Sequence, residues 1–199
     1  MKLRTATAAA LALGVLAFAP GARAQDAAAT PRGTTYGHAS QAEIRAAFGT
    51  GWRFALGYGK GKKQCPDDDD GKAESFCTAR TPAFTDLEIG FGASDGLEVT
   101  GGVRLGLEDL NDDPAPLALG LGIRAYTSPL SAIKFYIGAR GIVDLTSGQN
   151  TDFALRAEPG LQFELLRSVA LSVQTGVTLG LVRWLRFEVD GALALQYRF

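Results

Sequence analysis

The chain has 199 residues, with 20 Lys and Arg against 21 Asp and Glu, and hydrophobic residues make up 46% of it. The formal net charge of -1 leaves no excess of positive charge, so the composition argues against a nucleic-acid partner. After residue 24 no uninterrupted apolar stretch reaches the length of about 18 residues that indicates a transmembrane helix. If the mature chain spans a membrane, it must do so with strands.

Residues 1–24 have the layout of a cleaved secretory signal peptide. Lys2 and Arg4 precede an apolar stretch at residues 8–19, and Ala-Arg-Ala at residues 22–24 forms an A-x-A cleavage site. The apolar stretch is shorter than the roughly 20 residues that a spanning helix needs. Cleavage after residue 24 leaves 17 Lys and Arg, 21 Asp and Glu, and a formal net charge of -4.

Residues 25–42 are mostly small or polar and show no sustained period. We expect them to form a flexible periplasmic lead-in without a fold of its own. The single histidine, His38, falls in this segment, and we interpret it as a solvated residue.

Residues 43–199 divide into eight segments in which apolar and polar residues alternate, separated by turn signals. Such a period of two is typical of a strand with one apolar face. The last segment is the clearest, because Leu185, Phe187 and Val189 alternate with Arg186 and Glu188. The predicted strands span residues 43–60, 83–93, 97–108, 116–126, 132–144, 152–165, 168–181 and 184–199. In the sixth, Pro159 removes a ladder donor, so we expect irregular pairing there.

The polar faces carry eight basic and nine acidic residues, a near balance that suggests ion pairing. A soluble barrel turns its apolar face inward, whereas an outer-membrane barrel turns its polar face inward. The signal peptide favours the second arrangement, with charges in an interior that side chains of eight strands just fill. The predicted interior charges are Arg53, Asp86, Glu88, Glu98, Arg104, Glu108, Arg124, Lys134, Arg140, Asp144, Arg156, Glu158, Glu164, Arg186, Glu188, Asp190 and Arg198.

The sequence ends in an L-x-L-x-Y-x-F pattern formed by Leu193, Leu195, Tyr197 and Phe199, all on the apolar face of the last segment. With the signal peptide and the eight segments, this ending resembles the small OmpA-like and OmpX-like outer-membrane barrels. The resemblance covers residues 43–199. It implies an all-β fold, an eight-stranded antiparallel transmembrane β-barrel with up-and-down meander order. It also implies that the four terminal residues are an assembly signal read by the outer-membrane assembly machinery.

An even number of strands places both ends of the barrel on one side, which we expect to be periplasmic. The outer connections are then residues 61–82, 109–115, 145–151 and 182–183. The first contains the only two cysteines, Cys65 and Cys77, which we expect to form a disulfide in an exported protein.

The first outer connection also contains an acidic run at residues 67–70 that invites a calcium interpretation. An EF-hand pattern set on Gly71 puts Pro66 at the first ligand position and Cys77 at the position of the bidentate Glu. We therefore predict a solvated acidic loop and no metal site.

These patterns favour a monomeric barrel in the bacterial outer membrane, in contact with lipids and lipopolysaccharide, with a structural or surface-interaction role through its outer loops. A narrow passive channel is the first alternative. A lipid A modifying enzyme is the second, but acyl transfer needs a nucleophile beside a base. His38 precedes the first predicted strand and no His-x-Ser pair lies on any strand. We therefore predict no catalytic residue, no cofactor and no enzymatic activity.

Overall fold

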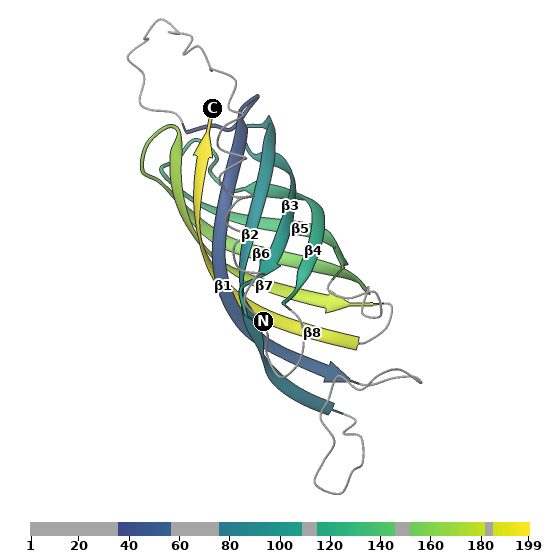
Figure 1. Ribbon diagram of the computed structural model, residues 1–199. Helices are drawn as coiled ribbons and strands as arrows, with labels where there is room; N and C mark the ends of the chain where they lie inside the picture. Colours follow the sequence, from purple (N-terminus) through teal and green to yellow (C-terminus); the bar gives the residue numbers. More distant parts are fainter. Residues whose placement is uncertain (1–35, 57–75, 109–114, 146–151, 182–184) are drawn as a thin grey trace, which may run out of the picture. The chain divides into compact units, whose positions relative to one another are not determined.

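The computed structural model describes residues 36–56, 76–108, 115–145, 152–181 and 185–199. These residues form eight strands that close into a barrel (Figure 1). The strands are β1 (Ala42–Leu56), β2 (Phe76–Ser94), β3 (Leu97–Gly106), β4 (Leu117–Tyr126), β5 (Ile133–Asp144), β6 (Asp152–Glu164), β7 (Val169–Gly180) and β8 (Leu185–Arg198). No helix in the described part of the chain is long and apolar enough to cross a membrane.

Every strand pairs antiparallel with its neighbour in the chain, and β8 pairs with β1 to close the barrel. At the end of this seam the backbone N–H of Phe199 donates to the carbonyl of Ala42 at 3.0 Å. The Ala42 N–H donates back to the Phe199 carbonyl at 3.2 Å. The predicted fold class, an eight-stranded up-and-down antiparallel barrel, is confirmed.

The first hairpin differs from the prediction. β1 ends at Leu56, before residue 60, and β2 begins at Phe76, inside the predicted outer connection 61–82. β2 includes Thr81 and Pro82 by means of a bulge. Gly49 pairs with Phe84 and Gly51 with Thr81, so Pro82 falls in the irregular step, where its missing N–H costs no ladder bond.

Pro159 of β6 interrupts pairing on one side only. It pairs with Ile137 of β5, whereas the β6–β7 ladder has no pair at residues 158 and 159. The register is the same on both sides of this gap, with Ala157 opposite Val177 and Gly160 opposite Gln174. The expected irregular pairing is confirmed, as a gap without a bulge.

The two faces of the barrel wall have opposite character. The outward face carries large apolar side chains, among them Leu121 of β4 at 75% exposure and Ile89 of β2 at 64%. The inward face carries most of the buried charges, together with small apolar residues such as Ala47 and Ala192. Because side chains alternate along a strand, one register fixes both faces at once.

Candidate functional site: the polar interior of the barrel

A central cluster gathers three arginines around one carboxylate. Glu88 of β2 accepts from Arg124 of β4 at 2.7 Å, contacts Arg140 of β5 at 2.6 Å, and contacts Arg45 of β1 at 3.4 Å. Arg124 is 1% exposed. Charges buried this deeply are stable only when each is paired and hydrogen-bonded. The cluster therefore depends on four strands supplying the right charges at one level.

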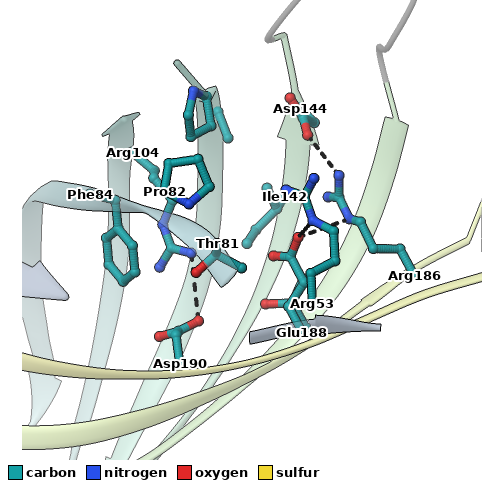
Figure 2. A pocket seen from close by; sticks show the side chains of 13 residues that line it. Arg53, Thr81, Pro82, Phe84, Arg104, Ile142, Asp144, Arg186, Glu188 and Asp190 are labelled. Carbon is teal, nitrogen blue, oxygen red and sulfur yellow. Dashed lines mark hydrogen bonds and ion pairs between the residues drawn. The ribbon is translucent and has the colours of Figure 1, made fainter. Parts of the chain in front are cut away.

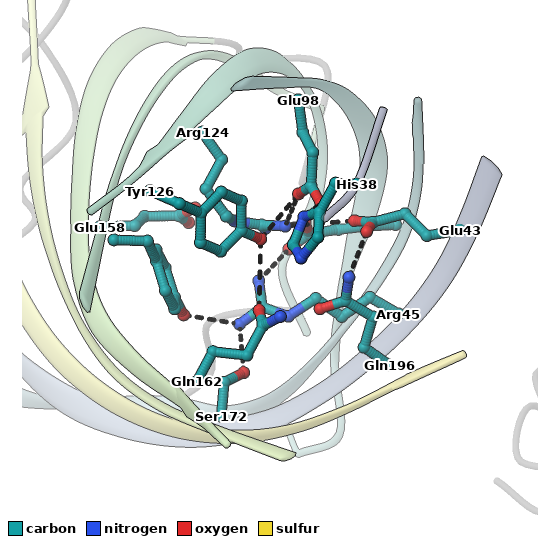
Figure 3. A network of polar contacts seen from close by, with 12 residues as sticks. His38, Glu43, Arg45, Glu98, Arg124, Tyr126, Glu158, Gln162, Ser172 and Gln196 are labelled. Atoms are coloured by element: carbon teal, nitrogen blue, oxygen red, sulfur yellow. Dashed lines mark hydrogen bonds and ion pairs between the residues drawn. The ribbon is translucent and has the colours of Figure 1, made fainter. Parts of the chain in front are cut away.

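Arg45 connects the central cluster to neutral groups on β5 and β7. Its guanidinium donates to the hydroxyls of Tyr136 and Ser172, each at 2.9 Å, and to the Gln174 side-chain carbonyl at 2.5 Å. The Tyr136 hydroxyl in turn donates to the same Gln174 oxygen at 2.8 Å. These bonds join β1 to β5 and β7 across the interior, in the network of which Figure 3 shows a part.

Two further arginines, each paired with an aspartate, lie nearer the end of the barrel where β1 leads into β2. Arg156 of β6 makes two bonds to Asp190 of β8, at 2.5 and 2.6 Å. Arg104 of β3 makes two bonds to Asp86 of β2, at 2.8 and 2.7 Å. Bidentate pairs of this kind fix the guanidinium plane as well as supplying charge.

The same end contains a cavity of about 40 Å³, which is room for one or a few water molecules. Figure 2 shows Arg53 and Arg186 beside it, together with their acidic partners. Arg53 pairs with Glu188 at 2.6 Å, and Arg186 pairs with Asp144 at 3.1 Å. Figure 2 also shows Arg104, whose guanidinium carbon lies 3.8 Å from the centre of the Phe84 ring.

Inward-facing glycines make room for these long side chains. A Cβ atom at Gly120 would lie 2.5 Å from Cδ of Arg140, and one at Gly160 would lie 2.5 Å from Cζ of Tyr136. At Gly176 a Cβ would overlap the guanidinium of Arg156. The alternation of glycine with arginine and tyrosine thus fits large and small residues into a narrow interior.

The structure pairs sixteen of the seventeen predicted interior charges with one another. Glu108 is the exception, and its assignment to the interior is wrong. It follows the last residue of β3, Gly106, and is partly exposed. Its carboxylate accepts from the Ala83 N–H at 2.8 Å and pairs with Arg80. The alternation had been extended past the point where the strand ends.

Sequence reasoning missed two interior charges, Glu43 and Arg45, at the start of β1. They have the same odd-numbered parity as Arg53, and β1 carries no extra residue between them, because the bulge lies on β2. Counting back from Arg53 with a period of two would have found both. The Glu43 carboxylate contacts Arg124 at 3.2 Å and accepts a hydrogen bond from Gln196.

His38 is a further interior residue, and its interpretation as a solvated lead-in residue is wrong. It is 1% exposed. Its Nδ1 pairs with Glu98, and its Nε2 lies 2.6 Å from Nζ of Lys134 and 3.3 Å from the Glu164 carboxylate. The physical reason is that the chain before β1 turns at Ser40, which has a φ of 60°, and crosses the barrel end. No periodic signal marks this contact.

Within the described residues, His38, Glu43 and Glu98 are close enough together to hold a metal ion, and all three are buried. The charge already present argues against a metal ion there. Arg124 donates from one nitrogen to Glu43 at 3.2 Å and to Glu98 at 3.1 Å. The guanidinium therefore occupies the position between the two carboxylates that a cation would take.

The structure does not test the predictions made for three sets of residues. The signal peptide and Cys65 lie outside the described residues, and of Cys77 only the backbone is described, opposite Ala55 in the β1–β2 ladder. The disulfide therefore stays a prediction. Residues 193, 195, 197 and 199 are exposed on the outward face at the end of β8, but their role as an assembly signal also stays a prediction.

The fold of the chain is similar to that of several solved structures. The N-terminal β-barrel domain of Pseudomonas aeruginosa OprF is similar with a TM-score of 0.56 at 14% identity, covering 81% of this chain and 98% of that one. Neisserial surface protein A is similar with a TM-score of 0.54 at 11% identity, covering 79% and 99%. The chain has the fold of the small eight-stranded outer-membrane barrels.

A designed transmembrane β-barrel also shares this barrel fold, with a TM-score of 0.50 at 12% identity over 81% of this chain and 97% of that one. No protein-family model and no curated protein sequence matches the chain. Because the identities are this low, the similarity concerns the fold, and the function has to be argued from the barrel's own surfaces.

Proposed function

We propose that the chain is an integral protein of a bacterial outer membrane. The observation that carries this proposal is the inverted polarity of the barrel, with leucines exposed on the outward face and paired charges inside. In water such a wall would expose a continuous belt of large apolar side chains. In lipid the same wall exposes its apolar face to hydrocarbon. Because the barrel is closed, the backbone N–H and C=O groups of the strands can bond to neighbouring strands.

The role that we propose is structural or surface-interacting, exerted through the outer loops, with an interior closed to solutes. The closed interior is supported by the ion pairs that follow one another along the barrel, from that of Glu164 at one end to that of Asp144 at the other. Between them lie the central cluster and the Arg156–Asp190 pair. An interior filled by side chains is also what an eight-stranded barrel is wide enough to hold.

A narrow passive channel is the second candidate, and the cavity of about 40 Å³ between Arg53 and Arg186 favours it. The Arg53 side chain is 23% exposed, so the interior is partly wet at this end. A conducting path would also have to pass the Arg156–Asp190 pair and the central cluster, which would have to separate for each ion.

We further propose that the chain is not an enzyme and uses no cofactor. His38 is the only histidine. It is buried between Glu98, Glu164 and Lys134 rather than beside a nucleophile that faces a substrate. A base in this position has no access to a lipid headgroup.

The proposed partners are outer-membrane lipids, lipopolysaccharide and the outer-membrane assembly machinery, and we expect a monomer. In the proposed orientation both ends of the barrel are periplasmic, and the loops after β1, β3, β5 and β7 face outward. Cys65 and Cys77 would then close the first outer loop by a disulfide in an oxidising compartment.

Density-gradient fractionation and trypsin treatment of intact cells test the location and the orientation together. Residues 57–75 contain four lysines, whereas Arg167 lies exposed in the turn between β6 and β7 at the opposite end. We expect the protein in the outer-membrane fraction, with cleavage in residues 57–75 in intact cells. We expect cleavage at Arg167 only after the outer membrane is permeabilised.

Recovery in the soluble or inner-membrane fraction would contradict the location, and cleavage at Arg167 alone in intact cells would reverse the orientation. Non-reducing mass spectrometry of the tryptic peptides tests the disulfide separately. A linked pair of peptides containing residues 65 and 77 is expected, and free thiols at both positions would disprove the bond.

A further inference from the structure

Residues 36–41, which we call the strap, cross the end of the barrel at which β1 begins. The Tyr36 N–H donates to the Leu130 carbonyl, in the turn between β4 and β5, at 3.5 Å. The Ala39 N–H donates to the Asp95 side chain, in the turn between β2 and β3, at 3.3 Å. The Ser40 N–H donates to the Gly92 carbonyl at 2.8 Å. The strap is therefore attached to two separate turns and to the end of β2.

The strap inserts His38 into the interior, where Figure 3 shows it beside Glu98. Its ring packs edge-on against Tyr126, with 4.4 Å between the ring centres. Lys134 lies beneath the strap at 0% exposure. The Lys134 ammonium donates to the Tyr36 carbonyl at 2.5 Å and contacts His38 Nε2 at 2.6 Å. The strap thus covers a charge that belongs to the wall.

The wall beneath the strap has its own charge partners. Lys134 pairs with Glu164 at 2.7 Å, and Arg198 pairs with the other oxygen of Glu164. Glu98 accepts from Arg124 at 3.1 Å and from the Tyr126 hydroxyl at 2.7 Å. Every one of these groups lies on a strand of the barrel. Removing the strap would therefore leave Lys134, Glu98 and Glu164 paired with other residues of the barrel wall.

The seat of the strap depends on a glycine in the wall. A Cβ atom at Gly92 would overlap the carbonyl oxygen of His38. Because both are backbone positions, the strap would have to move away from β2 to relieve the overlap. Gly96, in the neighbouring turn, is different, because the nearest atom to a Cβ there is the Tyr126 carbonyl oxygen at an ordinary 3.5 Å. Substitution of Gly92 by alanine should therefore displace the strap, and substitution of Gly96 by alanine is a matched control that should not.

We propose that the strap is a displaceable plug, which closes this end of the barrel with His38 and can leave its seat while the barrel stays folded. In the seated state Lys134 is shielded from water. In the displaced state water and small reagents reach Lys134, while the strand pairing and the central cluster remain. This proposal stands on the strap contacts and is independent of the proposed surface role.

The test uses the full mature chain, folded in detergent micelles, and a water-soluble reagent that acylates amines. The modification rate of Lys134, read by mass spectrometry, is compared in the wild type, Gly92→Ala, His38→Ala and the control Gly96→Ala. We expect acceleration on the order of ten-fold in the first two variants, because both unseat the strap. We expect the wild-type rate in the control and an unchanged heat-modifiable gel shift in all four.

Protection of Lys134 in folded Gly92→Ala and folded His38→Ala would overturn the proposal. So would loss of the folded barrel in both variants, since a plug must leave without unfolding the wall. Amide hydrogen exchange in the wild type supplies a second readout. The Ser40 amide should exchange faster than paired amides in the middle of β8, and equal protection would show that the strap is a fixed part of the barrel.

Discussion

The two ends of the barrel interior hold similar charges in different surroundings. At the end where β1 begins, His38, Lys134 and Glu98 are covered by the strap and almost completely buried. At the opposite end Arg53 and Arg104 keep part of their surface in contact with solvent, and the cavity of about 40 Å³ lies beside them. Water can replace a lost partner at the second end but not at the first. The same ion pair should therefore matter more at the strap end and in the centre.

Replacement of a central arginine should have the largest effect. Arg124→Ala leaves Glu43, Glu88 and Glu98 without their shared cation, and removing one partner of a buried pair costs about 3–5 kcal/mol. The control Arg53→Ala, at the wetter end, should cost about 1 kcal/mol or less. Urea unfolding of the barrel in lipid vesicles measures both. Equal losses for the two variants would remove the distinction between centre and end.

In the proposed location the outward face of the barrel contacts lipid. Leu121 lies in the middle of β4 on the outward face, so Leu121→Arg should lower the free energy of unfolding in vesicles by about 2–4 kcal/mol. Leu107 follows β3 at the end of the barrel, and Leu107→Arg should cost about 1 kcal/mol or less. A soluble barrel would tolerate both changes, so an unaffected Leu121→Arg protein would contradict the membrane account.

A glycine substitution tests how tightly the interior is packed away from the strap. Gly176→Val would push against the Arg156 guanidinium and its bond to Asp190, and such overpacking costs about 1–3 kcal/mol. Gly191 lies on neighbouring β8, where a Cβ would meet no atom within 4 Å. Gly191→Val should therefore cause no loss. Equal tolerance of both changes in the same unfolding assay would show that Arg156 has free space around it.

The smallest effect is expected at Glu108, beyond the end of β3. The Ala83 N–H, aided by Arg80, holds the pKa of Glu108 below its usual value of 4.5. A lowered pKa stabilises the fold above pH 4.5, and this contribution is lost as the pH falls through the lowered value. Glu108→Gln should therefore remove a slight acid-dependent loss of stability. A Glu108 carboxyl that titrates at or above 4.5 by NMR would disprove the contact.

Regular alternation explains how far the sequence predicts this fold. In β8 every second residue from Arg186 is polar or small, and the structure turns that set inward. The same rule places Arg124, Lys134 and Arg140 correctly because β4 and β5 have no bulge. Local periodicity thus determines the wall and most of its charges.

The features that the sequence did not predict depend on contacts distant in the chain or on irregular backbone. His38 is placed by Glu164, which lies 126 residues away, and no local pattern records that contact. The start of β2 lies inside the predicted outer connection 61–82. Pro is normally excluded from a paired strand, and the bulge between Gly49 and Gly51 is what keeps Pro82 in β2. Glu108 was misassigned because the alternation continues for two residues after β3 has ended.

Single-channel recording from the purified, folded protein in planar lipid bilayers tests the closed interior most directly. The account predicts no stable unitary conductance, because Arg45, Arg124 and Arg140 surround Glu88 across the middle of the barrel. Gly92→Ala should be equally silent, since displacing the strap leaves that cluster in place. Well-defined open steps in the wild type, with a size that changes in Arg104→Ala or Arg140→Ala, would contradict the account and establish the narrow channel instead.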